Sequence, residues 1–498
     1  MAPPPNRVFR ITAPQILRVS LISLVLVIPC FWHKHIQAGD LGSHTYNAWL
    51  AQLVERGEAP GLYLAAQWKN ILFDLLLFQL CKLFGFALGE KTAVSICVLI
   101  FFWGVFAFIR AATGRAPWVL TPVVAMLSYG YVFHMGFMNY YLSLGLACMA
   151  LACAWNGSRR GLVAGAFFLP VLYLAHPLGF LFLLSLAAYW LVRERLPGWW
   201  KAILPVAAVA ALILLHLYFE RNAKALTVSW PRRPIAQWNG TDQFMVFGGA
   251  YEYLAVTMVL FGLFCAAMAL FQENGGTSIW KTRALFGELY IVSFVAMLLL
   301  PQDLRPVPQG SWIGEVVTRL TIIAAIFAIG VLATLAPRKW QLAGFTVIAV
   351  LYFAFVYRDT GVLDRMERNA EILTKALPFG TRVASTVYSP PGYRPFYEHL
   401  VDRACIAACY HYSNYEPSTG EFRVRILPGG SALAAETVEE SEQFQFGGRL
   451  VQAHDLPLKQ IYQCDANELE KLCIRDLEAG EKNGRLGYRP AHFPWDPQ

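Results

Sequence analysis

Asp40 and His44 have the side-chain types and the spacing that acid–base chemistry requires. Asp40 follows the first long apolar segment and opens the polar stretch 39–44, ahead of an amphipathic run. An acidic side chain at a membrane boundary is either solvated or held there for a purpose. A helix would place both side chains on one face, where they can form a hydrogen-bonded acid–base pair or support a divalent metal. The plainer alternatives are a helix N-cap for Asp40 and a water-facing histidine for His44. We take Asp40 as the best candidate for a catalytic group.

Three more polar side chains, His134, Asn139 and His176, come from two turns between apolar segments. The topology predicted below brings both turns to the same membrane boundary as Asp40. Intramembrane polar groups usually face the interior of a helical bundle, so these residues are candidates for contacts to a substrate. The alternative is structural, since a helix broken before Pro177 leaves backbone groups that need polar partners.

The elements that must position these residues are membrane helices. The 498 residues are 56% hydrophobic and only 15% charged, and the apolar residues come in repeated blocks of membrane-spanning length. Residues 1–357 contain only 13 of the 33 acidic residues. The composition therefore predicts a polytopic membrane protein whose transmembrane domain, 1–357, precedes a water-soluble domain, 358–498.

The net charge of +8 does not indicate nucleic-acid binding, because the basic residues fall in small groups between apolar blocks and form no continuous basic face. They indicate topology instead. Five groups look cytoplasmic: 110 and 115, 159 and 160, 193 and 195 with 201, 281 and 283, and 338 and 339. All five lie in the cytoplasm if segment 71–88 is an interfacial or re-entrant helix within one long outer loop, 33–91. We then expect eleven spans, approximately at 16–32, 92–109, 117–133, 137–155, 161–175, 177–192, 201–219, 244–271, 284–300, 319–336 and 340–357. We expect the N-terminus in the cytoplasm. Eleven crossings then place the C-terminal domain on the outer side of the cytoplasmic membrane.

The C-terminal domain reads as a small α/β or β-rich unit. Residues 364–377 have helical periodicity, 382–387 read as a strand, and 421–427 alternate polar and apolar residues as a half-buried strand does. Residues 466–477 look like a short helix.

The domain contains four of the ten cysteines, Cys405, Cys409, Cys464 and Cys473. In an extracytoplasmic domain they can form two disulfides, and pairing within each local pair is one of three connectivities.

The order of these features resembles the GT-C superfamily of glycosyltransferases, and in particular its poorly characterised bacterial members. The likeness rests on Gly39-Asp40, on a helix-then-turn pattern at 46–57, and on segments 135–142, 174–180 and 414–418. Many members carry a second acidic residue at the outer turn where this chain has His134 and Asn139. The resemblance implies transfer of a sugar from a polyprenyl-phosphate-linked donor to a glycan, lipid or protein acceptor on the outer face of the cytoplasmic membrane.

Such a reaction develops positive charge at the anomeric carbon and negative charge on the leaving phosphate. A carboxylate can deprotonate the acceptor hydroxyl while cations hold the phosphate. In this interpretation Asp40 is the general base, with His44 beside it, and Arg305 and Arg319, at the outer ends of two spans, hold the phosphate. A divalent metal is left open. A transporter and an inactive membrane scaffold of the same architecture are the alternative functions.

Overall fold

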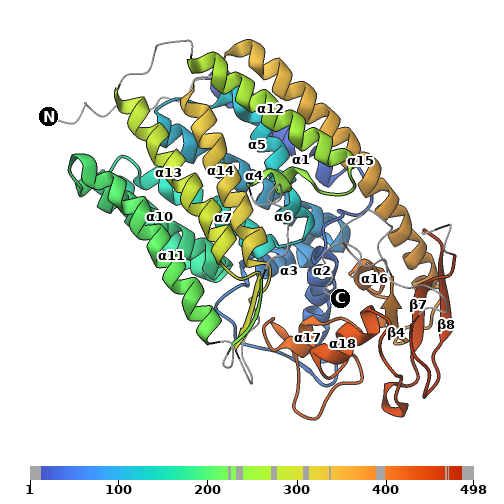
Figure 1. Ribbon diagram of the computed structural model, residues 1–498. Coiled ribbons are helices and arrows are strands. Elements are labelled where there is room, and N and C mark those ends of the chain that lie inside the picture. The colour runs from blue at the N-terminus through green and yellow to red at the C-terminus, as the bar shows by residue number, and fades with distance from the viewer. Residues whose placement is uncertain are drawn as a thin grey trace.

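Apolar helices form most of the chain up to Lys375 (Figure 1). The computed structural model describes residues 13–222, 226–230, 239–270, 277–306, 313–335, 338–387, 399–465, 468 and 470–484. The helices of the membrane part are α1 (Ala13–Val27), α4 (Phe86–Thr113), α5 (Thr121–Ser128), α6 (Tyr131–His134), α7 (Met138–Ala154), α8 (Arg159–Ala166), α9 (Phe168–Ala175), α10 (Pro177–Arg195), α11 (Ile203–Arg221), α12 (Ala250–Leu270), α13 (Thr277–Leu299), α14 (Val316–Thr334) and α15 (Lys339–Lys375). The chain is therefore a polytopic helical membrane protein, as its composition predicts.

Each of the eleven predicted spans falls on one or more of these helices. Within the described residues, eight helical segments are long and apolar enough to cross a bilayer, and the stretches 118–134 and 138–154 are shorter apolar helices. The pair α8 and α9, each of eight residues, covers the predicted span 161–175 as two short pieces. The number of crossings stays a prediction.

Helices α4 and α7 are in backbone contact at the centre of the bundle. A β-carbon on Gly104 of α4 would lie 2.2 Å from the carbonyl oxygen of Gly145 in α7. Small residues allow such close approach where no hydrophobic effect drives helices together in lipid. The contact holds α7, whose first turn carries Asn139, against α4.

Helix α15 differs from the predicted boundary between the two parts of the chain. The predicted span 340–357 and the predicted helix 364–377 are one uninterrupted helix of 37 residues. At 1.5 Å per residue it is about 55 Å long, well beyond the roughly 30 Å of a hydrocarbon core. The helix therefore continues from the bundle into the C-terminal domain, along one edge of the molecule in Figure 1.

The first loop contains α2 (Leu41–Glu55), β1 (Leu62–Leu64) and α3 (Leu72–Phe84). Helix α3 spans most of the segment predicted to be interfacial, and its 13 residues rise only about 20 Å, too little to cross a bilayer. Gly85, with a φ of 75°, reverses the chain from α3 directly into α4. Strand β1 pairs antiparallel with β6 (Val424–Ile426), so the first loop and the C-terminal domain lie on the same side of the bundle.

The C-terminal domain is built on a four-stranded sheet in the order β5-β4-β7-β8. Its strands are β4 (Arg382–Thr386), β5 (Tyr410–His411), β7 (Lys459–Gln463) and β8 (Leu472–Asp476), and its helices are α16 (Leu400–Ala404), α17 (Glu416–Thr419) and α18 (Val438–Gln445). The strand predicted at 382–387 is confirmed as β4, and the one at 421–427 is confirmed in a shorter form as β6.

The predicted helix 466–477 is wrong over its second half. Residues 472–476 form β8, which pairs antiparallel with β7 along its whole length. Cross-strand pairing with a neighbouring strand here overrides the local helical pattern. Residues 466, 467 and 469 lie outside the described residues. Both cysteine pairs are local disulfides, Cys405–Cys409 and Cys464–Cys473.

A cluster of buried charges joins the two parts of the chain. The Arg403 guanidinium on α16 donates to both carboxylate oxygens of Glu367 on α15, at 2.7 and 2.8 Å, and to Glu90 on α4 at 2.7 Å. Gln37 also donates a hydrogen bond to Glu367, and Thr45 donates one to Glu90. We call this group, with the neighbouring ion pairs of His35 to Asp364 and Glu371, the Arg403 cluster.

Candidate active site

The backbone of the Asp40 turn is fixed by the α6–α7 turn. The Gly39 amide donates to the His134 carbonyl at 2.8 Å, and the Asp40 amide donates to the Met135 carbonyl at 3.2 Å. The His134 ring lies 2.9 Å, through Nδ1, from the Gln37 carbonyl oxygen. The approach is so close that a β-carbon on Gly39 would lie 2.6 Å from the Met135 oxygen. His134 thus lies beside the Asp40 turn and positions the backbone before Asp40.

The Asp40 carboxylate is not used to cap α2. Asp40 occupies the N-cap position, but its side chain makes no capping hydrogen bond within the described part of the chain. The side chain is 28% exposed, and Oδ1 lies 3.7 Å from Nε2 of His399. The Asp40 carboxylate therefore does not act as an N-cap, the simpler structural role considered for it.

His44 lies one helical turn after Asp40, and its amide donates to the Asp40 carbonyl at 2.9 Å. Its ring turns to two other carboxylates. Nδ1 lies 2.8 Å from Oδ1 of Asp74 on α3, off the axis of a hydrogen bond but close enough for an ion pair, and 3.5 Å from Oε1 of Glu416 on α17. The predicted spacing thus places both side chains at one site, with His44 paired to carboxylates other than Asp40.

Asn139 fixes the position of Asp74. Its Nδ2 donates to Oδ2 of Asp74 at 2.8 Å, while its Oδ1 accepts from the Phe73 amide at 2.7 Å. The side chain at the start of α7 therefore reaches the candidate site through α3.

Burial and charge set the protonation of this part of the site. Burial alone would lower the pKa of His44, but the carboxylates of Asp74 and Glu416 raise it to about 10. Burial raises the pKa of Glu416 to about 7, although the neighbouring His44 acts in the opposite direction. His44 is thus a fixed positive charge at neutral pH.

The C-terminal domain contributes a second branch of the site. His399 donates or accepts through Nδ1 at 2.9 Å from Oδ2 of Asp402, and the other oxygen of Asp402 lies 2.6 Å from Nδ1 of His411. Asn414 links the branches, since its Nδ2 donates to Asp402 and to Ser43 of α2, both at 2.8 Å. We call the whole group the Asp40 cluster: Asp40, His44, Asp74, His399, Asp402 and Glu416.

Four members of the Asp40 cluster, Asp74, His399, Asp402 and Glu416, are absent from the residues that the sequence singled out as candidates. Asp74 interrupts an apolar segment, and Glu416 lies in a segment on which the family resemblance rests. Those were the available signals. The residues of the C-terminal domain lie more than 350 positions from Asp40 in the chain, so only the fold brings them together.

Arg319 and His176 lie beside one aromatic side chain, Tyr140, near the start of α14. The Arg319 guanidinium stacks 4.3 Å above the Phe137 ring, and Tyr140 donates to the Arg319 carbonyl at 2.5 Å. The His176 ring lies 5.4 Å from the Tyr140 ring and accepts from the Leu178 amide through Nδ1, which caps α10.

Arg319 retains a donor that has no hydrogen-bond partner in the described part of the chain. Its Nη1 donates to the Gly314 carbonyl, while its buried Nε has no hydrogen-bond partner among the described residues. The Asp40 carboxylate is one of the charges that act on this guanidinium. Arg319 is therefore a cation of the bundle that is electrostatically linked to Asp40.

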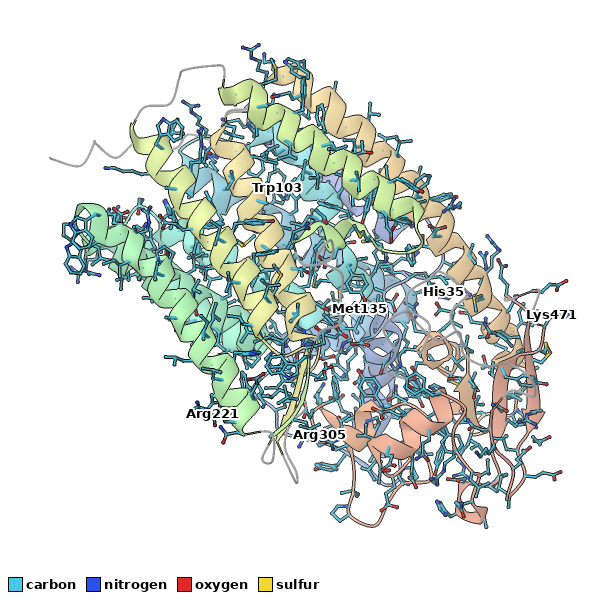
Figure 2. The ribbon with its side chains drawn as sticks, in the orientation of Figure 1. His35, Trp103, Met135, Arg221, Arg305 and Lys471 are labelled. Atoms are coloured by element: carbon cyan, nitrogen blue, oxygen red, sulfur yellow. A yellow bond between two sulfur atoms is a disulfide. The ribbon has the colours of Figure 1, made fainter. Side chains whose placement is uncertain are left out.

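Arg305 is placed elsewhere. It lies on β3 (Asp303–Pro306), opposite Thr227 of β2 (Leu226–Ser229), and its side chain is exposed. Figure 2 shows it well separated from Met135, the residue whose carbonyl holds the Asp40 turn. Burial raises the pKa of Glu442 in α18 and Arg305 lowers it, so this hairpin faces the C-terminal domain.

No set of three or more histidine, cysteine or acidic side chains in the described ranges is arranged to hold a metal ion. The carboxylates of the Asp40 cluster are instead interleaved with histidines.

The comparisons with known proteins give one similar structure. No protein-family model and no curated protein matches the chain. Among solved structures, the crystal structure of ArnT from Cupriavidus metallidurans in the apo state aligns over 91% of this chain and 93% of that one, with a TM-score of 0.36 and 13% identity.

Proposed function

We propose that this protein is a membrane glycosyltransferase that moves a sugar from a polyprenyl-phosphate-linked donor to an acceptor hydroxyl. The observation that carries the proposal is the Asp40 carboxylate, which is partly exposed, performs no capping role and lies among His399, His44 and Arg319. A carboxylate used only for stability would be expected to take hydrogen bonds from its own helix.

In the proposed reaction Asp40 removes the proton of the acceptor hydroxyl. The acceptor oxygen forms the new bond to the anomeric carbon as the bond from that carbon to the phosphate oxygen breaks. The electron pair leaves with the polyprenyl phosphate, and the Arg319 guanidinium stabilises its charge. Arg319 suits this role because its Nε still has hydrogen-bonding capacity within the described protein.

The remaining candidates support these two groups. His44, held positive by Asp74 and Glu416, supplies a positive charge beside Asp40. His134 and Asn139 position the Asp40 turn and Asp74, and His176 packs on the aromatic ring beside Arg319. We assign Arg305, on the exposed hairpin facing the C-terminal domain, a contact with an anionic group at the rim of the site.

We further propose that the site faces the outside of the cytoplasmic membrane. The β1–β6 pairing fastens the first loop to a domain that holds two disulfides, and disulfides persist in oxidising compartments. A glycan, a lipid or a protein on that side would then supply the acceptor hydroxyl.

The test uses the full-length protein in proteoliposomes with a panel of polyprenyl-phosphate-linked sugars and a mixture of envelope glycans, lipids and proteins. The wild type should release polyprenyl phosphate and label an acceptor, and Asp40→Asn should abolish both. If wild-type protein that binds the carrier never turns it over, the enzyme proposal fails in favour of a scaffold.

A further inference from the structure

The exposed side chains around the end of α1 and along the first half of α15 are apolar, and those that follow them on both segments are cationic. The exposed apolar side chains are Leu24, Val25 and Ile28 near the end of α1 and Val347, Val350 and Leu351 on α15. Lys34 comes next on the first segment, and Arg358, Arg365 and Arg368 come next on the second. An exposed apolar belt belongs in the hydrocarbon of a bilayer, and cations at its edge belong among the lipid headgroups.

An aromatic contact joins the two segments where this change occurs. The ring centroids of Trp32 and Tyr357 lie 5.3 Å apart, and the His33 ring stacks on Tyr357 at 4.7 Å. Nε2 of His33 also lies 2.8 Å from the Tyr357 carbonyl oxygen. Tryptophan and tyrosine are enriched at the surfaces of membranes, and the predicted spans 16–32 and 340–357 end at these two residues. The contact therefore belongs at the level of the headgroups.

A hollow of about 610 Å³ opens beside the aromatic contact, and an incoming group meets mainly positive charge in it. Its lining contains four cationic side chains and one carboxylate, namely Lys34, Arg358, Arg365, Arg368 and Asp364. The three arginines have the spacing of one helical face. The carboxylate is only 1% exposed, whereas Lys34, Arg365 and Arg368 are 46%, 49% and 46% exposed.

Gly361 leaves space in the wall of the hollow between the two segments. A β-carbon at this position would lie 3.2 Å from Cε1 of His33 and 3.9 Å from Nη1 of Arg365. The Arg365 side chain thus reaches back one turn toward the apolar half of α15, the direction in which helical side chains lean. Its Nε and Nη2 donate to Glu470, both at 2.8 Å, and its Nη1 makes no hydrogen bond to a described residue.

The carboxylates behind the hollow are each shared by two cations. Asp364 lies 3.0 Å from both Arg368 and His35, and Glu371 pairs with Lys34 and, at 2.9 Å, with His35. Burial alone would lower the pKa of His35, but its acidic neighbours raise it to about 9, so His35 is itself positive at neutral pH. Lys34 and Arg368 therefore have no carboxylate of their own and can pair with a further anion.

We propose that this hollow binds the phosphate of an anionic membrane lipid. Nη1 of Arg365, the Arg368 guanidinium and the Lys34 ammonium would donate to the phosphate oxygens, a ligand that guanidinium groups suit well. The lipid chains would lie along the exposed apolar side chains next to the hollow. A phospholipid of the bilayer and a polyprenyl phosphate both present this chemistry. Lipid binding here does not depend on the proposed function, because no residue of the Asp40 cluster lines the hollow.

The test is native mass spectrometry of the full-length protein in a non-ionic detergent, with deuterated dioleoylphosphatidylglycerol as the probe. The wild type should bind this lipid, and dioleoylphosphatidylcholine, which has no net charge, should bind far more weakly. The double variant Arg365→Gln/Arg368→Gln should bind phosphatidylglycerol about 20-fold more weakly, since each basic side chain near a lipid phosphate contributes roughly a factor of five. Arg368→Gln alone, which leaves the Arg365 pair with Glu470 in place, is the second variant and should lose about five-fold.

Arg56→Gln is the matched control. Arg56 is also about half exposed and also pairs with a carboxylate, Glu58 at 2.9 Å, but it does not line the hollow. The control should bind phosphatidylglycerol as the wild type does. Wild-type binding by Arg368→Gln and by the double variant, or an equal loss in Arg56→Gln, would overturn the proposal. Higher salt should release the lipid from the wild type, and binding that resists salt would also contradict it.

Competition identifies the source of the phosphate. A polyprenyl phosphate that displaces the labelled phosphatidylglycerol would extend the site to carrier lipids, and failure to displace it would assign the site to phospholipids of the bilayer. Inorganic phosphate at the same concentration should not compete, and equal competition would overturn the assignment to a lipid. Because the readout is binding, a protein without transferase activity should still carry phosphatidylglycerol, so this test and that of the proposed function can fail separately.

Discussion

The Asp40 cluster and the Arg403 cluster use the same residue types at the same junction and are organised in opposite ways. In the Arg403 cluster, Glu367 and Glu90 each accept from the guanidinium and from a second donor, and their side chains are 0% and 5% exposed. In the Asp40 cluster the Asp40 side chain is 28% exposed, and its carboxylate lies 3.7 Å from the ring of His399.

The difference separates groups that hold the fold from groups available for chemistry. A buried charge costs little only when each of its hydrogen-bonding positions is filled, and the Arg403 cluster meets that requirement. A catalytic base must keep a position open for the proton that it removes. The two clusters therefore differ in role because of how deeply their carboxylates are buried and how many of their hydrogen-bonding positions are filled, and not because of residue type.

The largest effect on stability is expected from Arg403→Met. This change leaves the carboxylates of Glu367 and Glu90 buried without their cation, which should destabilise the protein by about 3–5 kcal/mol. Denaturant unfolding of the purified protein, followed by tryptophan fluorescence, measures the change.

Arg365→Met is the control for that prediction. Arg365 makes a similar bidentate pair with Glu470, but the two side chains are 49% and 35% exposed. The loss should be about 1 kcal/mol or less. Equal losses in the two variants would contradict the assignment of the Arg403 cluster to stability.

A large effect on activity with no effect on folding is expected from Arg319→Gln. Removing the guanidinium leaves the departing phosphate without its donor, and transfer should fall about 100-fold. The same change at Arg305, on the exposed hairpin, should cost only a few-fold. Initial rates of polyprenyl-phosphate release compare the two, and a greater loss at Arg305 would move the phosphate site to the rim.

A smaller effect, which depends on pH, is expected at His35 of the Arg403 cluster. Burial alone would lower its pKa, but Glu367, Asp364 and Glu371 raise it from 6.5 to about 9. Since the folded state binds this proton more tightly than the unfolded state, the stabilisation is complete below pH 6.5 and is lost as the pH rises through 9.

The measurement is the difference in unfolding free energy between the wild type and His35→Gln at several pH values. It should be roughly 3 kcal/mol at pH 6 and should shrink as the pH rises from 6.5 through 9. A difference that grows with pH would show that His35 is neutral in the folded protein.

The last prediction concerns the side of the membrane on which each part of the chain lies, and chemical labelling tests it without altering stability or activity. In intact cells Cys464 and Cys473, the disulfide-bonded pair of the C-terminal domain that is not buried, should react with a membrane-impermeant maleimide only after reduction. A cysteine replacing Arg159, at the start of α8, should stay unlabelled from outside, because the predicted topology places it in the cytoplasm. Labelling of R159C from outside would reverse the topology.

The sequence predicted what depends on local pattern. Apolar length located the membrane helices, and the polar residue at the end of the first span drew attention to Asp40. The pattern failed at 472–476, where pairing with β7 determines the structure. It also did not predict that α15 continues past residue 357, because nothing in a span's hydropathy marks where its helix ends.

The site was predicted only in its first half, for a related reason. His134 and Asn139 reach the candidate site through the turn that follows α6 and through α3. His399 and Asp402 carry no local signal, since a histidine three residues before an aspartate is common on any surface helix. Their meaning comes from the contact between α16 and α2, which depends on the whole fold.

The most direct test places Asp40→Asn and Arg403→Met side by side in the transfer assay and in the unfolding experiment. The account predicts that Asp40→Asn loses transfer by at least about 100-fold while its unfolding free energy and carrier binding match the wild type. Arg403→Met should instead lose stability, and the fraction that stays folded should retain transfer. An Asp40→Asn protein with wild-type transfer, or one that unfolds as readily as Arg403→Met, would contradict the account.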